Sequence, residues 1–256
     1  MNKNKRVVVG MSGGVDSSVT ALLLKQQGYD VVGLFMRNWE YGIKGSQCPN
    51  RIEFEDAKKV GALIGIEVLG KDFVKEYKDR VFDVFLDGLK QGLTPNPDIL
   101  CNKEIKFNVF LNEAKKMGAD MIATGHYAKI AKYKDHFVLD TPKDSSKDQS
   151  YFLHALSSEQ LSHAMFPLGD LTKKEVREIA RAHNLPVSDK KDSTGICFIG
   201  NQKFDEFITQ HLQAIPGDII DENGKVIGKH KGLVCYTLGQ RKGIGLGGLK
   251  GNESEN

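Results

Sequence analysis

Short apolar runs alternate with amphipathic stretches through the first 200 residues of this 256-residue chain. The apolar runs at residues 6–9, 31–36 and 120–124 are typical of buried strands, and a further short strand is predicted over 66–69. Apolar positions spaced by three and four predict helices over 19–25, 52–63, 73–89, 102–117, 149–156 and 173–183. Thr172 and Glu175 have the spacing of a capping box at the start of the last helix. Strands that alternate with helices form right-handed parallel units, so we expect an α/β fold with a doubly wound, mostly parallel sheet.

The pattern changes after residue 200, where one more helix is predicted over 204–212 and short strands around 221–224. We therefore expect a main domain over residues 1–200 and a small β-rich second domain over 201–256. The residues from Gly243 onward are glycine-rich and then polar, so this second domain is expected to be partial.

Composition and charge add little that is specific. The chain is 40% hydrophobic and 27% charged, and no apolar run approaches the roughly 20 residues that a membrane helix needs. No apolar signal region precedes the first strand, so we expect a cytoplasmic protein without a membrane partner. A net charge of +3 permits nucleic-acid binding without arguing for it. The four cysteines form no Cys-x-x-Cys pair, which disfavours structural zinc and predicts free thiols unless two of them do redox chemistry.

The first candidate site is the turn between the first strand and the first helix, Gly10-Met11-Ser12-Gly13-Gly14-Val15-Asp16-Ser17. Gly13 and Gly14 can adopt positive φ and expose backbone N–H groups beside a helix N-terminus, which predicts a phosphate cradle. No lysine stands in the loop, so a Walker-type loop is disfavoured. Asp16 would repel phosphates unless it holds Mg²⁺, so a metal site at Asp16 is implied. The alternative is a tight turn that binds nothing.

Two cysteines are candidates for chemistry. Pro95 and Pro97 stiffen the loop before Cys101, which we expect at the start of a helix, where the helix dipole would lower the thiol pKa. On these grounds alone, a nucleophile and a buried structural cysteine are equally good interpretations. Cys197 lies among small and polar residues over 192–200, a weak signal by itself. His126, at a strand end, is left without a role, and Trp39 is interpreted as a packing residue.

The motifs together resemble a known family. The glycine loop is similar to the pyrophosphate loop of the ATP pyrophosphatases, which adenylate a substrate oxygen. The combination also includes Thr94 to Phe107, with its Asn-Pro-Asp-x-x-Cys, and a distal Gly-Ile-Cys-Phe-Ile-Gly, and it ends with Tyr236 to Gly243. In this order the motifs resemble the tRNA-specific 2-thiouridylases from about residue 6 to 248. The resemblance implies an adenine nucleotide alpha hydrolase-like (PP-loop) catalytic domain over 1–200.

The resemblance implies an ATP-dependent tRNA-uridine 2-sulfurtransferase acting on the wobble uridine of tRNAs for lysine, glutamate and glutamine. It assigns the nucleophile to Cys101, the persulfide carrier to Cys197, and ATP and Mg²⁺ to the loop with Asp16. The implied nucleotide contacts are Gly10, Met11, Ser12, Gly13, Gly14, Val15, Asp16, Ser17, Met36 and Gly125. The implied contacts to the target base are Asn96, Pro97 and Asp98, and those to tRNA are Lys147, Asp148 and Gln149.

The resemblance further implies a persulfide donor, either a cysteine desulfurase or a sulfur-relay protein, and we expect a monomer. Whether the persulfide attacks the base directly or releases sulfide first is left open. Family members continue into a C-terminal β-barrel that is absent from this sequence, so we expect a truncated form. Two alternatives remain: a tRNA-binding remnant without thiolation activity, and an ATP pyrophosphatase that acts on a small molecule.

Overall fold

The computed structural model describes residues 5–41, 48–192, 195–200 and 202–246. The chain divides into two compact units. The first comprises residues 1–82 and 97–198, and the second comprises residues 83–96 and 199–256. The short segment 83–96 groups with the second unit although the hydrophobic pattern of the sequence gives no sign of this.

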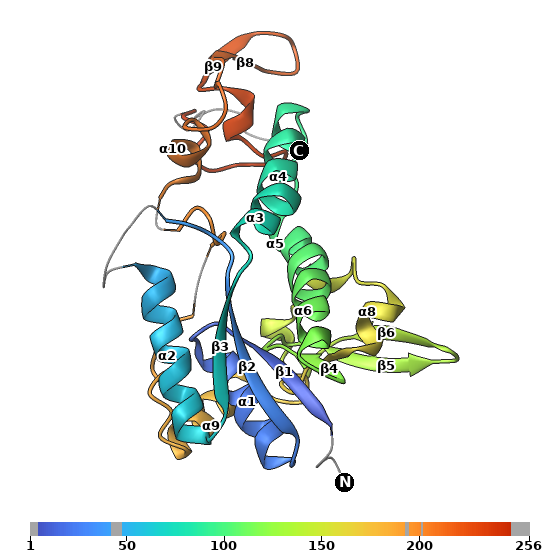
Figure 1. Cartoon of the computed structure of the whole chain (residues 1–256). Helices are drawn as coiled ribbons and strands as arrows, with labels where there is room; N and C mark the ends of the chain where they lie inside the picture. Colours follow the sequence, from blue (N-terminus) through green and yellow to red (C-terminus); the bar gives the residue numbers. More distant parts are fainter. Residues whose placement is uncertain (1–4, 42–47, 193–194, 201, 247–256) are drawn as a thin grey trace. The chain divides into compact units, whose positions relative to one another are not determined.

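The first unit is built on one parallel sheet (Figure 1). Its strands are β1 (Arg6–Met11), β2 (Asp30–Arg37), β3 (Glu67–Asp72), β4 (Met121–Ala123) and β7 (Ala164–Met165), in the order β3-β2-β1-β4-β7. Every neighbouring pair is parallel, which confirms the predicted α/β class and sheet. The four strands predicted from the sequence overlap β1 to β4. The two-residue β7 was not predicted, because so short a run leaves no periodic signal.

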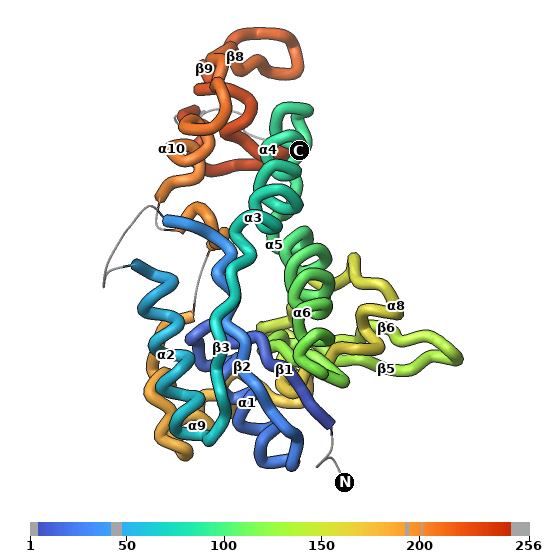
Figure 2. Tube along the Cα trace, viewed as in Figure 1, coloured from blue at the N-terminus to red at the C-terminus, as the bar shows by residue number. Residues whose placement is uncertain are grey.

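Helices cover both faces of this sheet. In the first unit they are α1 (Val15–Gln26), α2 (Pro49–Ile64), α3 (Val74–Tyr77), η2 (Lys78–Phe82), α5 (Pro97–Leu100), η3 (Cys101–Val109), α6 (Phe110–Lys116), η4 (Ser145–Lys147), α7 (Ser150–Leu153), α8 (Ser158–Ser162) and α9 (Lys173–Ala182). Figures 1 and 2 show α1, α2 and α9 together on one face and α6 on the other. The capping box predicted from Thr172 and Glu175 is present at the start of α9.

The first helix begins earlier than its apolar pattern predicts. It starts at Val15 instead of residue 19, after an extended N-cap residue, Gly14. Its first turns bury hydroxyl side chains whose oxygens bond the backbone within the helix: Ser18 Oγ donates to the Gly14 carbonyl at 2.8 Å and Thr20 Oγ1 to the Asp16 carbonyl at 2.9 Å. Because these buried positions are polar, counting apolar residues misses them. The phosphate-loop residues Val15, Asp16 and Ser17 therefore lie in the helix.

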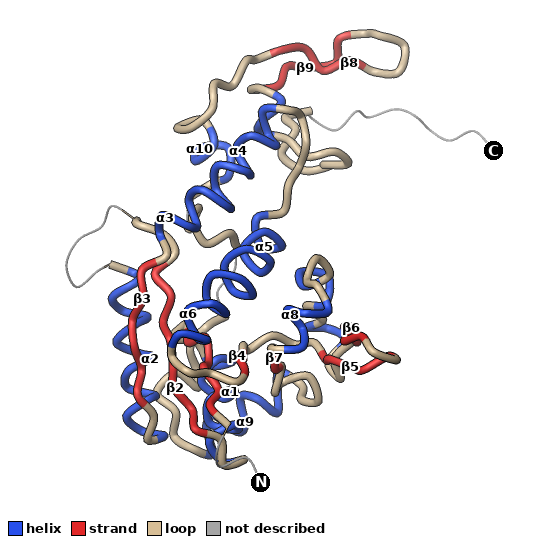
Figure 3. Tube along the Cα trace, turned by 45° about the vertical axis from the view of Figure 1, so that its right-hand side comes forward, coloured by secondary structure: helices blue, strands red, loops and turns tan. Residues whose placement is uncertain are grey.

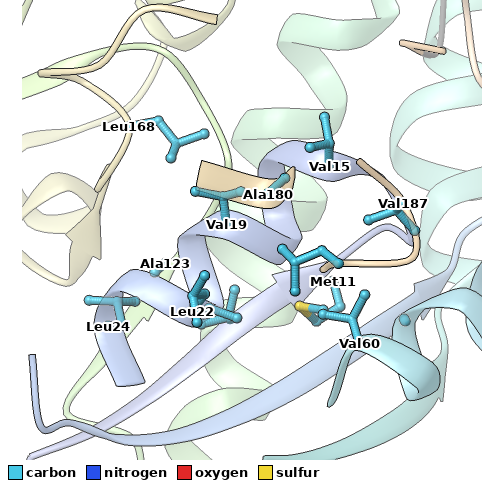
Figure 4. Packing of buried hydrophobic residues seen from close by; sticks show 14 of the residues in the cluster. Met11, Val15, Val19, Leu22, Leu24, Val60, Ala123, Leu168, Ala180 and Val187 are labelled. Atoms are coloured by element: carbon cyan, nitrogen blue, oxygen red, sulfur yellow. The ribbon is translucent and has the colours of Figure 1, made fainter. Parts of the chain in front are cut away.

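The main core lies between the sheet and the α1, α2 and α9 face. Alternate residues of β1, among them Met11, pack with Val19 of α1, Val60 of α2 and Ala180 of α9, and Figure 4 shows this packing. Since side chains of a strand alternate between faces, Val8 of β1 is buried on the opposite side. Burial of β1 on both faces holds its carboxyl end, where the glycine loop begins, in a fixed position.

The strand order reverses at β1, with β2 and β3 on one side of it and β4 and β7 on the other. Ligands of open α/β sheets bind at the carboxyl ends of the strands beside such a reversal. The glycine loop follows β1, and Gly125 follows β4, so both flank this point. The topology therefore places the predicted nucleotide site where this fold binds ligands.

Two hairpins complete the described chain. The first pairs β5 (Lys129–Tyr133) with β6 (His136–Asp140) in antiparallel register and lies beside α8 (Figure 3). The second unit contains α4 (Asp83–Lys90), α10 (Phe204–Ile208), η5 (Leu233–Cys235) and the antiparallel pair β8 (Gly217–Ile220) and β9 (Val226–His230). In the described ranges no helix has the length and hydropathy needed to cross a bilayer.

Candidate active site

Internal hydrogen bonds hold the glycine loop in shape, and the first turn of α1 has no side-chain cap. Ser17 Oγ accepts from the Ser12 N–H at 3.2 Å and donates to the Gly14 carbonyl at 3.2 Å. Gly13 has φ 68°, as predicted, whereas Gly14 has φ −103° and is extended, so positive φ at Gly14 was wrong. No side chain caps α1. An uncapped helix N-terminus beside a glycine turn is suited to bind an anion.

Gly13 is required by space as well as by its backbone conformation. A Cβ at this position would lie 2.3 Å from the carbonyl oxygen of Glu53 in α2. We expect Gly13→Ala to lower the free energy of unfolding by roughly 2–5 kcal/mol, from the left-handed φ together with overpacking. The matched control is Gly28→Ala, because Gly28 has φ 84° but nothing within 4 Å of its Cβ position. Urea unfolding of both variants measures the difference, and equal losses would contradict the steric role of Gly13.

The other predicted nucleotide residues lie against this loop. A Cβ on Gly10 would come within 3.2 Å of Met36 Cε, so Met36 at the end of β2 touches the loop. A Cβ on Gly125 would lie 2.8 Å from the Ser17 backbone nitrogen. The structure therefore brings together the loop, Met36 and Gly125 around the N-terminus of α1.

Asp16 faces a lysine that the sequence pattern did not reveal. Lys173 Nζ, at the start of α9, lies 2.7 and 2.8 Å from the two carboxylate oxygens of Asp16. The Tyr127 hydroxyl donates to Asp16 at 2.9 Å, and burial, followed by the Asp16 charge, raises the pKa of Tyr127. A lysine that is absent from the loop itself thus reaches it from α9, a helix distant in sequence.

A magnesium ion fits the donors beside this loop only together with a ligand. Among the described residues there is no group of three or more His, Cys, Asp or Glu side chains that could hold a metal. Mg²⁺ is commonly held by one or two carboxylates plus substrate phosphates. Asp16, beside the uncapped N-terminus of α1, can supply one such carboxylate.

Asp192 extends the charge network from Asp16 toward the predicted tRNA segment. It accepts hydrogen bonds from Arg177 at 2.8 Å and Lys147 at 3.2 Å, and it pairs with Lys173 at 2.8 Å. Burial opposes ionisation of Asp192, but the hydrogen bonds from Lys173 and Lys147 prevail and lower its pKa. Lys147 and Asp16 are thereby linked through two intervening side chains.

The three residues of the predicted tRNA segment have different surroundings. Lys147 and Asp148 are exposed, whereas Gln149 is half-buried. Gln149 pairs with the backbone of Tyr127 through its side chain and its own N–H, both at 3.0 Å. Asp148 accepts from the Ser150 N–H at 2.8 Å at the start of α7. Exposure leaves Lys147 and Asp148 accessible to a ligand, and the position of Gln149 is fixed by its bonds to Tyr127.

Cys101 does not lie at a helix N-terminus. The helical run begins at Pro97, so Cys101 follows a complete α5, and the residue is 4% exposed. Burial raises the pKa of Cys101 to about 12, against an opposing effect of Lys106. The predicted lowering of this pKa by the helix dipole was therefore wrong for this conformation, because the unpaired N–H groups belong to residues before Cys101.

Cys197 is exposed, and contacts of its carbonyl group and of the next residue, Phe198, hold it in place. The Tyr41 hydroxyl donates to the Cys197 carbonyl at 2.9 Å, and Phe198 is buried against Trp39, Phe82 and Tyr77. The prediction that Trp39 packs is confirmed. Cys197 has an exposed surface. The protein atoms around its thiol nevertheless desolvate the thiolate form and raise the pKa. All four cysteines are free thiols.

The structure brings Cys101, Cys197 and Asp98 into electrostatic range of one another. The charges of Cys197 and Asp98 each raise the pKa of Cys101, and Asp98 also acts on Cys197. Asp98 is half-buried in α5, which raises its own pKa. Of the predicted base-contacting residues, Pro97 and Asp98 belong to the first unit and Asn96 to the second.

The segment before Cys197 is tied to the glycine loop. Lys190 Nζ donates to the Gly13 carbonyl at 2.9 Å and to Asp56 of α2 at 2.9 Å. The basic pair at 190–191 in the sequence gave no indication of this contact. Lys190, seven positions before Cys197, therefore connects this segment to the glycine loop and to α2.

The comparisons with known proteins cover the whole chain. Residues 5–201 match the family model described as the tRNA methyl transferase HUP domain, and residues 205–254 match that described as the tRNA methyl transferase PRC-barrel domain. The chain is 96% identical over 256 residues to the tRNA-specific 2-thiouridylase MnmA 2 of Aliarcobacter butzleri, covering 70% of that protein. It is 55% identical over 251 residues, 98% of its length, to the tRNA-specific 2-thiouridylase MnmA of Methylobacillus flagellatus, again covering 70%.

Solved structures with a similar arrangement are distant in sequence. One is a 4-thiouridine synthetase in complex with RNA and bound ATP, at 15% identity and a TM-score of 0.49, covering 80% of this chain and 50% of that one. Another is the U34-tRNA thiolase NcsA from Methanococcus maripaludis with its [4Fe-4S] cluster, at 18% identity and a TM-score of 0.46, covering 82% and 65%.

Proposed function

The chain belongs to the tRNA-specific 2-thiouridylase family, and from this we propose that it adenylates and then thiolates the wobble uridine of tRNA. The observation that carries the proposal is the placement of Cys101, Cys197 and Asp98 in one electrostatic cluster, within the same unit as the phosphate loop. An adenylating enzyme for a small molecule needs no such pair of cysteines. Sulfur transfer needs both.

Adenylation is assigned to the glycine loop and the start of α1. The uridine 2-oxygen attacks the α-phosphate of ATP, the bond to the β-phosphate breaks, and pyrophosphate leaves. The open N–H groups of α1 bind the phosphates, and Lys173 supplies positive charge where a Walker loop would place its own lysine. Mg²⁺ held by Asp16 would neutralise phosphate charge when bound. The 2-oxygen then leaves with AMP.

Sulfur transfer is assigned to the two cysteines. A persulfide on Cys197 carries the sulfur, and its accessible position suits loading by a cysteine desulfurase or a sulfur-relay protein. In one route the terminal sulfur attacks carbon 2 as AMP leaves, and Cys101 then attacks the Cys197 sulfur to release the thiolated base. In the other, Cys101 attacks first and frees sulfide, which attacks carbon 2. Both routes leave a Cys101–Cys197 disulfide that an external thiol must reduce.

The partners follow from the same proposal. The substrates are the tRNAs for lysine, glutamate and glutamine, and the anticodon base must unstack to reach Cys197, as in most single-stranded RNA recognition. The protein acts as a monomer in the cytoplasm. Pro97 and Asp98 meet the target base together with Asn96, and Lys147 and Asp148 contact the tRNA.

One assay tests the proposal and its alternatives. The full chain is incubated with ATP, unmodified tRNA, and cysteine with a desulfurase, and the products are 2-thiouridine, AMP and pyrophosphate. AMP formation that does not need tRNA would favour a small-molecule substrate. Binding of tRNA without either product would favour a non-catalytic role. The family models carry the words methyl transferase, so a methylated uridine in place of 2-thiouridine would overturn sulfur transfer.

Lys147→Ala is expected to weaken tRNA binding by several-fold and to flatten its salt dependence by about one charge, because a phosphate-contacting lysine releases one counterion. The same change frees Asp192 from one of its partners. The control is Lys25→Ala, since Lys25 lies exposed at the far end of α1. Affinity measured by fluorescence anisotropy at several salt concentrations decides, and an unchanged salt slope would make Lys147 a solvated residue.

A further inference from the structure

Two hydrogen bonds in series fix the position of Lys106, a lysine in electrostatic range of Cys101 and Cys197. Lys106 Nζ lies 3.4 Å from His126 Nε2, and His126 Nδ1 lies 2.7 Å from Thr124 Oγ1. A lysine ammonium can only donate, so Nε2 accepts and the ring proton lies on Nδ1, which donates to Thr124. Burial, followed by the Lys106 charge, lowers the pKa of His126 well below its ordinary value. At neutral pH the ring is therefore uncharged and accepts a hydrogen bond from Lys106.

The histidine that holds Lys106 is itself fixed. Its ring packs near Phe107 and Phe166, with centroids 6.1 and 6.0 Å away. Its second partner, Thr124, is 4% exposed and follows β4 at the carboxyl edge of the sheet. A half-buried ring bonded at both nitrogens and packed between two phenylalanines has little rotational freedom, so it can fix the direction of the ammonium group.

The helix geometry turns Lys106 toward Cys101. Both residues lie in η3, a π-helical segment, and they are five positions apart. In an α-helix, residues three and four apart share a face, but a π-helix closes its hydrogen bonds between i and i+5 and so brings i and i+5 together. The wider turn thus places the ammonium on the side of the helix that carries the sulfur.

Lys106 acts on three acidic groups at once. Its charge opposes the effect of burial on Asp98, Cys101 and Cys197. The other titratable groups that act on the two thiols or face them from neighbouring elements are acidic: Tyr41, Glu53, Tyr77 and Asp98. Among the described groups that act on Cys101, Lys106 is the single cation.

We infer that Lys106 is a positioning residue that holds the anionic forms of Cys101 and Cys197, and that His126 sets its place. The inference rests on the proposed sulfur transfer for its purpose. When a thiol loses its proton, or when Cys197 carries a persulfide anion, the negative charge gains an ammonium partner in a site that is otherwise acidic. The proton lost by the thiol leaves to solvent or to a base.

The test is the pH dependence of alkylation of Cys197 in the full chain, followed by peptide mass spectrometry with iodoacetamide. Lys106→Met removes the charge and keeps the apolar stem, whereas Lys106→Arg keeps the charge. We expect Lys106→Met to raise the midpoint pH of Cys197 alkylation by about one unit, because a nearby opposite charge is lost. Below the midpoint, this shift corresponds to alkylation that is about tenfold slower. Lys106→Arg should stay near wild type. Cys48 is the internal reference thiol.

The outcomes separate this role from a structural one. A midpoint in Lys106→Met equal to wild type would overturn the inference, whatever happens to thermal stability. His126→Phe, which keeps the ring packing and removes the acceptor, should shift the midpoint in the same direction by less. Equal midpoints in His126→Phe and wild type would overturn the part assigned to His126.

This test needs neither ATP nor tRNA, so it can fail separately from the proposed function. A Lys106-dependent midpoint without any 2-thiouridine would refute the proposed function alone. Normal 2-thiouridine formation by Lys106→Met, together with an unchanged midpoint, would refute this inference alone.

Discussion

Replacing Cys197 by serine is expected to abolish 2-thiouridine formation, by at least about a thousandfold, because a serine oxygen cannot carry or transfer the sulfur. Cys101→Ser should fail to thiolate to the same extent. The two variants should differ in sulfur loading: Cys101→Ser accepts labelled sulfur from a desulfurase, and Cys197→Ser does not. Mass spectrometry of the persulfide and nucleoside analysis of the tRNA measure both properties.

The control for this pair is Cys235→Ser. Cys235 is buried in the second unit, so its substitution should cost about 1–3 kcal/mol of stability and leave sulfur loading per folded molecule unchanged. Both active-site variants should still release pyrophosphate with tRNA, since the glycine loop is chemically separate from the thiols. Equal labelling of Cys197→Ser and wild type would reverse the assignment of the carrier.

Asp16→Ala is expected to reduce AMP and pyrophosphate formation by roughly 10²–10³-fold, the equivalent of several kcal/mol, because the carboxylate that would hold Mg²⁺ is lost. The change also removes one of the two carboxylate partners of Lys173 and the acceptor of the Tyr127 hydroxyl. Single-turnover release of pyrophosphate with saturating tRNA measures the adenylation step directly.

The control for this prediction is a carboxylate at the amino ends of the strands, opposite the ends that carry Asp16. Asp30 begins β2 and pairs with Arg6 at 2.7 Å between exposed side chains, so Asp30→Ala should leave adenylation near wild type. If Asp16→Ala releases pyrophosphate at the wild-type rate, the glycine loop is not the nucleotide site. Sulfur loading of Cys197 should persist in Asp16→Ala. This result would show that the variant is folded and that its loss of adenylation is not due to misfolding.

The fold was predictable where burial follows a simple period. The strands β1, β2 and β4 contain the apolar runs that predict them, and the α9 helix carries its own capping signal in Thr172 and Glu175. The start of α1 was not predictable from apolar positions, because buried Ser18 and Thr20 satisfy their hydroxyls within the helix. The short β7 carries no period at all.

The site was predictable only where its residues are close in sequence. The glycine loop and the loop before Cys101 can be found as motifs, since local geometry demands particular residues there. Lys173 reaches Asp16 from 157 positions away, and a lysine in the first turn of a helix looks like any solvated side chain. Lys106 is equally inconspicuous, because its surroundings depend on a π-helical turn that the sequence does not announce.

The dipole argument for Cys101 failed for a related reason. It depended on where the helix begins, and the boundary lies at Pro97, four residues earlier than supposed. A shift of one turn exchanges an exposed helix terminus for a buried position. The direction of a pKa change can therefore reverse with a small error in a helix boundary.

The aromatic cluster beneath Cys197 also provides an optical probe. Trp39 is the only tryptophan of the chain, and its ring centroid lies 5.6 Å from that of Phe198, the residue next to Cys197. Indole emission depends on the polarity around the ring and on contact with quenching groups. Tryptophan fluorescence of the unlabelled protein therefore reports on one place, the packing around Trp39 that includes Phe198 next to Cys197, and stopped-flow mixing can follow it in real time as sulfur, nucleotide or RNA is added.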